Sequence, residues 1–323
     1  MIKGNSSRRR FIVNGLKYSL GMSLLGLVTC GRIDDSTPKA TNTIKKKPWF
    51  KISLAQWSLR RMLESGQLNH LDFAKFTKEE FGIEAIEYVN LFFKNGTNNE
   101  YLNEINSRAQ DQGVKQLLIM IDGEGDLGNT DDLARKVAVI NHYKWVEAAK
   151  TLGCHSIRVN AFGKGKEKAV QSAVISGLGE LAQYAMPYNI NIIVENQGGF
   201  SSDGKWLSEV MRQVNLKNCG TLPDFGNFCM ERVEGQAWGS PCIKEYNQYI
   251  GLAELMPFAK GVSAKSRSFD PSCNEANIDY RKMLQIVKGA QYTGYIGIEY
   301  DGTDLSEVEG IRKTLDLLNE YNV

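Results

Sequence analysis

Two kinds of segment alternate along the chain from residue 50 onward. Short apolar runs rich in β-branched residues predict buried strands, and longer segments between them have the periodicity of amphipathic helices. The predicted strands are 50–57, 85–90, 115–121, 154–160, 190–195, 219–224, 260–265 and 295–299. The predicted helices are 70–81, 99–112, 131–151, 168–186, 204–215, 245–258, 279–290 and 305–320.

This alternation indicates the fold class. Three predicted helices end at a glycine (Gly82, Gly113 and Gly153), the residue that most easily takes the left-handed conformation at a helix end. Repeated strand–helix units predict a parallel sheet with crossover helices, and eight of them fit a closed (β/α)₈ barrel. An open doubly wound sheet would need a glycine-rich loop after the first strand, where the chain has Gln56-Trp-Ser-Leu59. We therefore predict a single α/β TIM barrel over residues 49–323.

The first 30 residues have the features of an export signal. A basic cluster, Ser7-Arg-Arg-Arg-Phe-Ile12, precedes an apolar stretch at 18–28 that is too short for a membrane-spanning helix. The cluster resembles a twin-arginine signal, and Leu27-Val-Thr-Cys30 resembles a lipobox whose cysteine becomes lipidated. Residues 31–48 are polar and predict a flexible tether. The alternative interpretation is a basic, disordered start ahead of a buried helix.

Setting this signal apart changes the charge of the chain. The 323 residues carry a formal net charge of +2, but residues 1–29 hold five basic residues and no acidic one, which leaves −3 for the remainder. A mildly acidic barrel argues against a nucleic-acid partner. With 42% hydrophobic and 24% charged residues, the composition is that of a globular protein and excludes a low-complexity or collagen-like chain. The predicted location is exported and periplasmic, with membrane contact only through the signal or a lipid anchor at Cys30.

In a TIM barrel the functional side chains lie at the carboxyl ends of the strands. Alternation along a strand decides which of them face the barrel mouth, and it places Arg158 and Asn160 on one face of the fourth strand. Glu195 and Glu299 each follow an apolar residue that suits the helix side, so both are predicted to turn inward. The polar or aromatic residues at the predicted strand ends are Gln56, Trp57, Glu87, Asn90, Asp122, Arg158, Asn160, Glu195, Asn196, Gln197, Asp224, Asn227, Lys265 and Glu299.

Three carboxylates, Glu195, Asp224 and Glu299, are predicted to meet at this mouth. Like charges that close raise one another's pKa unless a cation shares the site, and all-oxygen ligands favour a hard divalent ion such as Mg²⁺ or Mn²⁺. Such an ion could hold a substrate carbonyl while one glutamate takes a proton beside it and another returns the proton. The alternative is that these acids cap strand ends or pair with Lys265 and Arg158.

The same strand ends carry a family resemblance. The motifs are Ile193-Val-Glu-Asn196, Leu222-Pro-Asp-Phe-Gly-Asn-Phe228, Val262-Ser-Ala-Lys-Ser266 and Ile296-Gly-Ile-Glu-Tyr300. They resemble the xylose-isomerase-like barrel family, which includes sugar and sugar-phosphate isomerases and epimerases, inosose dehydratases and endonuclease IV. The overall pattern is similar to an exported, Bacteroidetes-type branch of that family. The resemblance implies a metal held from strands five to eight, at Glu195, Asp224, Ser263 and Glu299, with the two glutamates as the acid/base pair.

The chain departs from the family pattern at two positions. Ser263 stands where the family has a histidine two residues before the lysine, which is kept as Lys265, and Asn227 replaces a second histidine. Because serine is a poor ligand, three alternatives stay open: three carboxylates with water, the addition of Gln197, or no metal at all. In the last case Lys265 would supply the positive charge that polarises a carbonyl.

We therefore predict a sugar or keto-sugar isomerase or epimerase that acts on a small carbohydrate, with a divalent Mn, Mg or Co ion. The catalytic residues are predicted to be Glu195, Glu299 and Lys265, and the metal ligands to be Glu195, Asp224 and Glu299. The predicted substrate-binding residues are Gln56, Trp57, Glu87, Arg158, Asn160, Gln197 and Asn227. The alternatives are a keto-glycoside lyase or hydrolase, and a non-catalytic carbohydrate-binding lipoprotein. The sugar and the oligomeric state are left open, with a homodimer as one option.

The histidines are predicted to lie outside the catalytic site. His142 and His155 are interpreted as packing or supporting groups and His70 as a surface residue. Three histidines are too few for the trinuclear zinc cluster of the endonuclease branch.

The remaining cysteines and tryptophans receive structural interpretations. Cys154 and Cys219 begin strands and are predicted to be buried thiols. Three more cysteines lie in loops, where an exported protein could pair any two of them, and two tryptophans could stack on a sugar or pack internally. These residues are Cys229, Cys242 and Cys273, and Trp206 and Trp238.

Overall fold

The computed structural model describes residues 47–235 and 239–322. The predicted export signal, Cys30, most of the predicted tether and Trp238 lie outside these residues. Within them, no helix is both long enough and apolar enough to cross a membrane.

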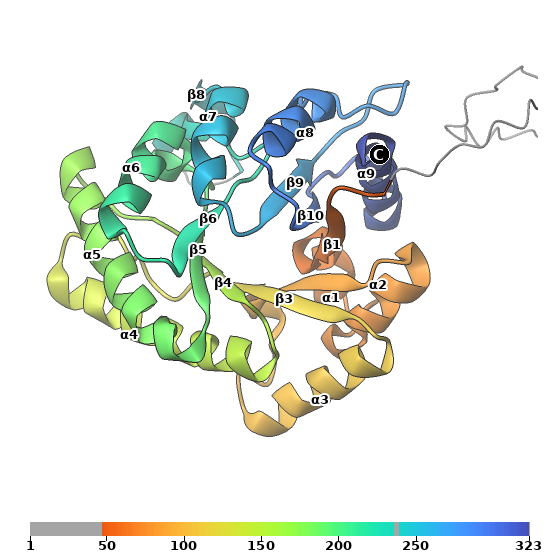
Figure 1. Ribbon diagram of the computed structural model, residues 1–323, viewed down its shortest axis with the longest axis horizontal. Coiled ribbons are helices and arrows are strands. Elements are labelled where there is room, and N and C mark those ends of the chain that lie inside the picture. Colours follow the sequence, from red (N-terminus) through yellow and green to blue (C-terminus); the bar gives the residue numbers. More distant parts are fainter. Residues whose placement is uncertain (1–46, 236–238, 323) are drawn as a thin grey trace, which may run out of the picture. The chain divides into compact units, whose positions relative to one another are not determined.

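An eight-stranded parallel sheet forms the centre of the fold and is strongly curled (Figure 1). Its order is β6-β5-β4-β3-β2-β1-β10-β9, and two isolated parallel bridges, Thr221–Ala259 and Asp224–Ser263, join the edge strands β6 and β9. This is the TIM-barrel-like arrangement that the alternating pattern predicts. The strands are β1 Lys51–Ala55, β2 Ala85–Val89, β3 Lys115–Met120, β4 Ser156–Val159, β5 Asn191–Glu195, β6 Cys219–Leu222, β9 Val262–Ser266 and β10 Tyr295–Tyr300.

Helices surround this sheet, as Figure 1 shows, and connect successive strands. Several begin at a side chain that accepts a backbone N–H of the first turn, and α9 begins with a full capping box at Ser306 and Glu309. The predicted glycine terminators all take a left-handed conformation, with φ of 68° at Gly82, 64° at Gly113 and 70° at Gly153. The helices are α1 Arg60–Glu64, α2 Phe73–Phe81, α3 Asn99–Asp111, α4 Asp132–Thr151, α5 Glu167–Ala185, α6 Gly204–Val214, α7 Gln248–Leu255, α8 Tyr280–Gly289 and α9 Glu307–Tyr321.

The two faces of each strand serve different purposes. The apolar residues at outward positions, such as Ile157, Val159, Ile296 and Ile298, are fully buried under the helices and belong to the main hydrophobic core. The intervening positions face the inside of the curled sheet, and near the carboxyl ends they are polar. A continuous core therefore holds the strand ends in place around a polar interior.

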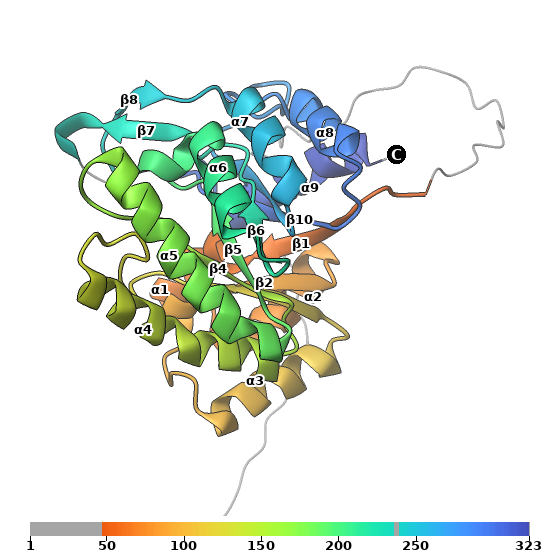
Figure 2. The same ribbon diagram turned by 60° about the vertical axis from the view of Figure 1, so that its left-hand side comes forward.

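A short antiparallel hairpin follows β6, where the sequence predicts only a loop. It consists of β7 Cys229–Arg232 and β8 Cys242–Glu245, and a disulfide joins Cys229 to Cys242 across its strands. Its strand β7 packs against the short helix η5 Gly199–Ser202 that precedes α6, and Figure 2 shows the hairpin near α6. The spacing of the cysteines left the pairing open, and the structure selects this pair. As predicted, Cys154 is a buried free thiol, and Cys219 is free and partly buried.

Candidate functional site

A cavity of about 960 Å³ opens at the carboxyl ends of the strands. Seven of the residues predicted for the site line it: Trp57, Arg158, Asn160, Gln197, Asn227, Lys265 and Glu299. Glu195 and Asp224 are fully buried just beneath it, in contact with residues of its wall. The structure thus brings most of the predicted residues together at one place.

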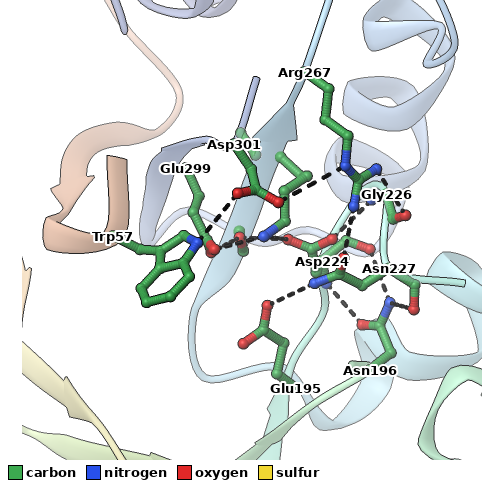
Figure 3. A network of polar contacts seen from close by, with 12 residues as sticks. Trp57, Glu195, Asn196, Asp224, Gly226, Asn227, Arg267, Glu299 and Asp301 are labelled. Atoms are coloured by element: carbon green, nitrogen blue, oxygen red, sulfur yellow. Dashed lines mark hydrogen bonds and ion pairs between the residues drawn. The ribbon is translucent and has the colours of Figure 1, made fainter. Parts of the chain in front are cut away.

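The three predicted carboxylates converge at the floor of the cavity (Figure 3). One oxygen from each of Glu195, Asp224 and Glu299 lies within 4.8 Å of the other two, and all three side chains are buried. Each comes from the end of a different strand: Glu195 ends β5, Asp224 follows β6, and Glu299 lies in β10. The parallel sheet therefore brings together three residues that are 29 and 75 positions apart along the chain.

Asn196 fixes the backbone that carries Asp224. Its Oδ1 accepts the Asp224 N–H over 2.8 Å, and its Nδ2 donates to the Asp224 carbonyl over 3.1 Å. The Gly226 N–H in turn donates to Asp224 Oδ1 over 2.8 Å. These bonds leave Asp224 Oδ2 directed at the cluster, where it meets the hydroxyl of Ser263.

Two buried cations border the carboxylates. Lys265 Nζ donates to Glu299 Oε1 over 2.5 Å and lies 3.9 Å from Asp224 Oδ2. Arg158 Nε lies 3.0 Å from Glu195 Oε2, close enough for an ion pair but without the direction of a hydrogen bond. Within residues 47–235 and 239–322, neither Arg158 Nε nor Glu195 Oε2 has a hydrogen-bond partner. Two positive charges do not cancel the charge of this acidic cluster and of Asp122 beside it.

Burial and the crowding of negative charge raise the pKa of two of these acids. Burial raises the pKa of Glu195 well above its usual value, the nearby Glu299 raises it further, and Arg158 only partly opposes this. Burial likewise raises the pKa of Asp224, although Lys265 and the Ser263 hydroxyl favour its ionised form. The site therefore favours an additional proton or an additional cation.

The residues present fit a hard divalent cation. They supply three carboxylates whose oxygens lie within 4.8 Å of one another, and Glu195 Oε2 is a buried oxygen with no hydrogen-bond donor. Oxygen ligands of this kind suit Mg²⁺ or Mn²⁺. Glu195, Asp224 and Glu299 would hold the ion, and the Ser263 hydroxyl lies beside two of them.

A second polar cluster lies on the cavity wall above β4. Asp122 Oδ1 accepts from Arg158 over 2.9 Å and from Asn160 over 2.7 Å. Burial alone would raise the pKa of Asp122, but Arg158 and the two hydrogen bonds outweigh it and lower the pKa. Arg158 thus joins Asp122 at the wall to Glu195 at the floor, which fixes the guanidinium in place.

The structure adds residues that sequence reasoning missed. Arg267 donates to Asn227 Oδ1 over 2.9 Å, and Asp301 accepts from Trp57 Nε1 over 3.3 Å, so both tie down predicted cavity residues (Figure 3). Arg267 lies two positions after Lys265, and Asp301 lies two positions after Glu299. Because every second side chain of a strand points to the same face, extending this alternation past the strand ends could have predicted both.

His142 is another residue of the cavity wall. Its Nδ1 bonds to the Ala138 carbonyl over 2.7 Å, while the side chain lines the cavity. Burial lowers the pKa of His142, so the neutral imidazole is favoured. His142 is buried and bonded to its own helix, as a packing or supporting group would be, and it also forms part of the cavity wall.

Three predictions need correction. Gln56 does not line the cavity, because its side chain accepts the Val89 N–H and bonds to His70 Nδ1 over 3.0 Å. His70 is not a surface residue: it is buried beside Gln56, and burial lowers its pKa to about 3. Glu87 also lies beneath the cavity rather than in its wall, where Ser53 Oγ donates to it over 2.7 Å. Each of these side chains bonds to or packs against a neighbouring strand or loop. The position of a residue at a predicted strand end does not reveal such contacts.

A family model and solved structures match the chain. A model described as "Xylose isomerase-like TIM barrel" matches residues 77–321. The 3-keto-D-glucoside 4-epimerase YcjR from E. coli is 15% identical, with a TM-score of 0.61 over 78% of this chain and 94% of that one. D-psicose 3-epimerase from Clostridium cellulolyticum H10, solved with D-tagatose, is 12% identical, with a TM-score of 0.62 over 84% and 98%. A xylose isomerase-like protein from Mycobacterium smegmatis in complex with magnesium is 16% identical, with a TM-score of 0.57 over 85% and 98%. The search of curated proteins found no match.

Proposed function

Because the chain belongs to the xylose isomerase-like TIM barrel family, we propose that it isomerises or epimerises a sugar or keto-sugar by moving a proton next to a carbonyl. The observation that carries this proposal is the position of Glu195 and Glu299, two buried glutamates that converge at the floor of a cavity of about 960 Å³. Such a reaction needs one group to remove a proton and another to return it.

The two glutamates differ in their surroundings, and this suits them to a proton exchange. Glu299 is ion-paired with Lys265, so its carboxylate can accept a proton from the carbon beside the carbonyl. The electron pair of that C–H bond then moves toward the carbonyl oxygen. Glu195, whose raised pKa favours its protonated form and whose Oε2 has no hydrogen-bond partner among the described residues, returns a proton to carbon. One proton leaves the substrate and one returns, so the reaction is balanced.

A divalent ion would assist this exchange. When bound by Glu195, Asp224 and Glu299, it would polarise the carbonyl and offset the negative charge that develops on its oxygen. Around it, Arg158 and Asn160 offer N–H donors to substrate oxygens from the β4 side of the cavity. Trp57 lines the same cavity and offers an indole ring on which the apolar face of a sugar can stack.

Solvent deuterium exchange into candidate sugars tests the proposed function. The native protein should introduce deuterium next to the carbonyl, and Glu195→Gln should lower the rate by about 100-fold or more. The matched control is Glu245→Gln, since Glu245 also lines the cavity but lies on the exposed β8 strand. Sugar binding without exchange or product would indicate a carbohydrate-binding protein instead. Elimination products would indicate a lyase.

We also propose that the protein is exported to the periplasm. The basic cluster and apolar stretch of residues 7–28 support this location, as does the Cys229–Cys242 disulfide, since disulfides persist in oxidising compartments. A fusion of residues 1–48 to a reporter that is active only after export would test the signal. Cys30→Ser in the full chain would show whether membrane attachment depends on that cysteine.

A further inference from the structure

Resting on the proposed function, we infer that Arg267 is a positioning residue for the proton transfer: it fixes the side-chain amide of Asn227, and that amide holds Glu195 by one oxygen. Figure 3 shows the three side chains together. Arg267 follows β9, Asn227 lies in the segment after β6, and Glu195 ends β5. The curled sheet therefore brings them together from three different strands.

The Asn227 amide lies between a guanidinium and a carboxylate. Its Oδ1 accepts from Arg267 Nη2 over 2.9 Å, and its Nδ2 donates to Glu195 Oε1 over 3.2 Å. A guanidinium can only donate hydrogen bonds, whereas an amide has an acceptor on one side and donors on the other. Turning the amide over would set N–H groups against N–H groups and oxygen against oxygen. Arg267 therefore determines that Asn227 donates to Glu195.

The guanidinium is itself held by two further acceptors. Arg267 Nη1 donates to the Gly226 carbonyl over 3.2 Å, and Arg267 Nε lies 3.9 Å from Asp301 Oδ2. A Cβ built on Gly226 would lie 3.0 Å from Arg267 Nη1, so the glycine leaves the space that the guanidinium needs. Because the donors of an arginine form a rigid planar fork, these contacts also fix the direction of Nη2. Arg267 thus meets the Asn227 amide in one orientation.

Fixing the amide determines which oxygen of Glu195 takes part in the reaction. Oε1 accepts the Asn227 N–H, while Oε2 has no hydrogen-bond partner among the described residues. The proton that Glu195 returns to carbon is therefore carried by Oε2, because Oε1 is already occupied by the Asn227 N–H. Proton transfer requires the donor atom to lie within hydrogen-bond reach of the reacting carbon, so a carboxyl that can rotate would transfer its proton more slowly.

The backbone of Asn227 is anchored as well. Its carbonyl accepts from Asn196 Nδ2 over 3.3 Å and from Ser202 Oγ over 2.8 Å. Asn227 is also one of the two positions at which the chain departs from the family pattern, so this arrangement follows from the chain's own residues. With its backbone fixed, rotation of the side-chain amide is the freedom that Arg267 removes.

Hydrogen exchange of side-chain amides tests the first step without a substrate. In protein that carries isotope-labelled asparagine, the NMR signals of the Asn227 amide are identified by their loss in Asn227→Ala. Arg267→Leu should make exchange of the Asn227 amide hydrogens with solvent at least about tenfold faster, because the amide is then free to turn. Arg267→Lys should restore part of the protection. The buried Asn196 amide is the internal control, since it donates to backbone carbonyls, and its rate should not change.

Kinetics of deuterium exchange test the second step, with D-psicose, D-tagatose and D-fructose as probes. On a probe that exchanges, Arg267→Leu and Asn227→Ala should each lower kcat by about 10- to 100-fold and change KM by less than about threefold. The double variant should be no slower than the slower single variant, since Arg267 acts through Asn227. The matched control is Arg212→Leu, which removes an exposed arginine that is ion-paired within α6.

Equal exchange rates of the Asn227 amide hydrogens in the native protein and in Arg267→Leu would overturn the inference. A double variant whose loss of kcat is the product of the two single losses would also overturn it, because Arg267 would then act on the substrate directly. Failure of the proposed function has a different signature. If no sugar exchanges deuterium with the native protein, the isomerase is lost, and the amide measurement still decides whether Arg267 fixes Asn227.

Discussion

The hydroxyl of Ser263 donates to Asp224 Oδ2 over 2.6 Å, at the position where the family resemblance predicts a metal-binding histidine. The same hydroxyl lies 3.1 Å from Glu299 Oε2, so a small neutral side chain sits between two carboxylates. A hydroxyl can donate to only one acceptor at a time, which leaves part of the negative charge uncompensated. This arrangement leaves room for an ion held by oxygen ligands and supplies no nitrogen ligand.

Restoring the histidine should therefore change metal selectivity. Ser263→His would add an imidazole nitrogen next to three carboxylates, and imidazole favours Zn²⁺ over Mg²⁺. We expect the variant to bind Zn²⁺ about tenfold more tightly or better, with little gain for Mg²⁺, in a competition titration of metal-free protein. The larger side chain occupies a buried position, so some loss of stability is expected.

Ser263→Ala is the control for that titration, because it removes the hydroxyl without adding a ligand. If Ser263→His and Ser263→Ala bind Zn²⁺ equally well, the histidine does not reach the carboxylates and the expectation is wrong.

The pH dependence of stability should contain a contribution from Glu87. Burial raises its pKa to about 7, with Glu299 adding to the effect and the Ser53 hydrogen bond opposing it. A carboxyl whose pKa is higher in the folded state stabilises the fold below its unfolded pKa and loses that contribution as pH rises through about 7. The loss amounts to about 3 kcal/mol by pH 8. Glu87→Gln, a neutral isostere, should therefore be more stable than the native protein at pH 8 and similar to it at pH 5.

Urea denaturation at the two pH values measures this difference. Glu79→Gln, on the exposed face of α2, is the control and should leave the pH dependence of stability unchanged. A native protein and a Glu87→Gln variant with parallel pH profiles would show that Glu87 is ionised at little cost.

Much of the fold could be predicted because it depends on local patterns. The eight predicted strands all occur, and the glycine terminators fall at the helix ends, since strand burial and helix termination are properties of a few consecutive residues. The alternation of side chains along a strand also predicted correctly that four polar residues point inward: Glu195, Glu299, Arg158 and Asn160. Their apolar neighbours pack under the helices, and successive side chains point to opposite faces of the sheet.

What the sequence could not show depends on contacts between distant segments. Gln56 and His70 lie fourteen positions apart, and only the folded chain reveals that Gln56 bonds to a buried His70 instead of facing the cavity. The β7–β8 hairpin was missed because its strands have only four residues each and are too polar to give a strand pattern. A groove beside the cavity, which both strands of that hairpin help to line, was missed with it.

Gly297 should be intolerant of a side chain. A Cβ built on this β10 residue would lie 2.5 Å from Glu87 Oε1, well inside contact distance. Gly297→Ala should therefore lower the free energy of unfolding by about 1–3 kcal/mol. Adding Glu87→Ala should recover part of the loss, since the clash is with that carboxyl.

Gly179→Ala provides the contrast for Gly297, because a Cβ at this position of α5 meets nothing within 4 Å. Replacing a helical glycine by alanine should stabilise the protein by about 0.5–1 kcal/mol. If denaturation curves show that both alanine variants are more stable than the native protein, or that both are less stable, the packing argument is wrong.

The Cys229–Cys242 disulfide should protect the hairpin from cleavage. It closes a loop of 13 residues, and opening such a loop restores chain entropy worth about 3 kcal/mol to the unfolded state. In the double variant Cys229→Ser/Cys242→Ser the hairpin should open more often while the surrounding barrel stays folded. Trypsin cleavage after Arg232 and Lys244 should then be at least about tenfold faster than in the native protein, as followed by mass spectrometry.

Cleavage after Lys164 serves as the internal control, because this exposed residue borders the same groove but does not belong to the hairpin. Its rate should be the same in both proteins. Unchanged cleavage after Arg232 and Lys244 would mean that packing against the barrel, and not the disulfide, holds the hairpin in place.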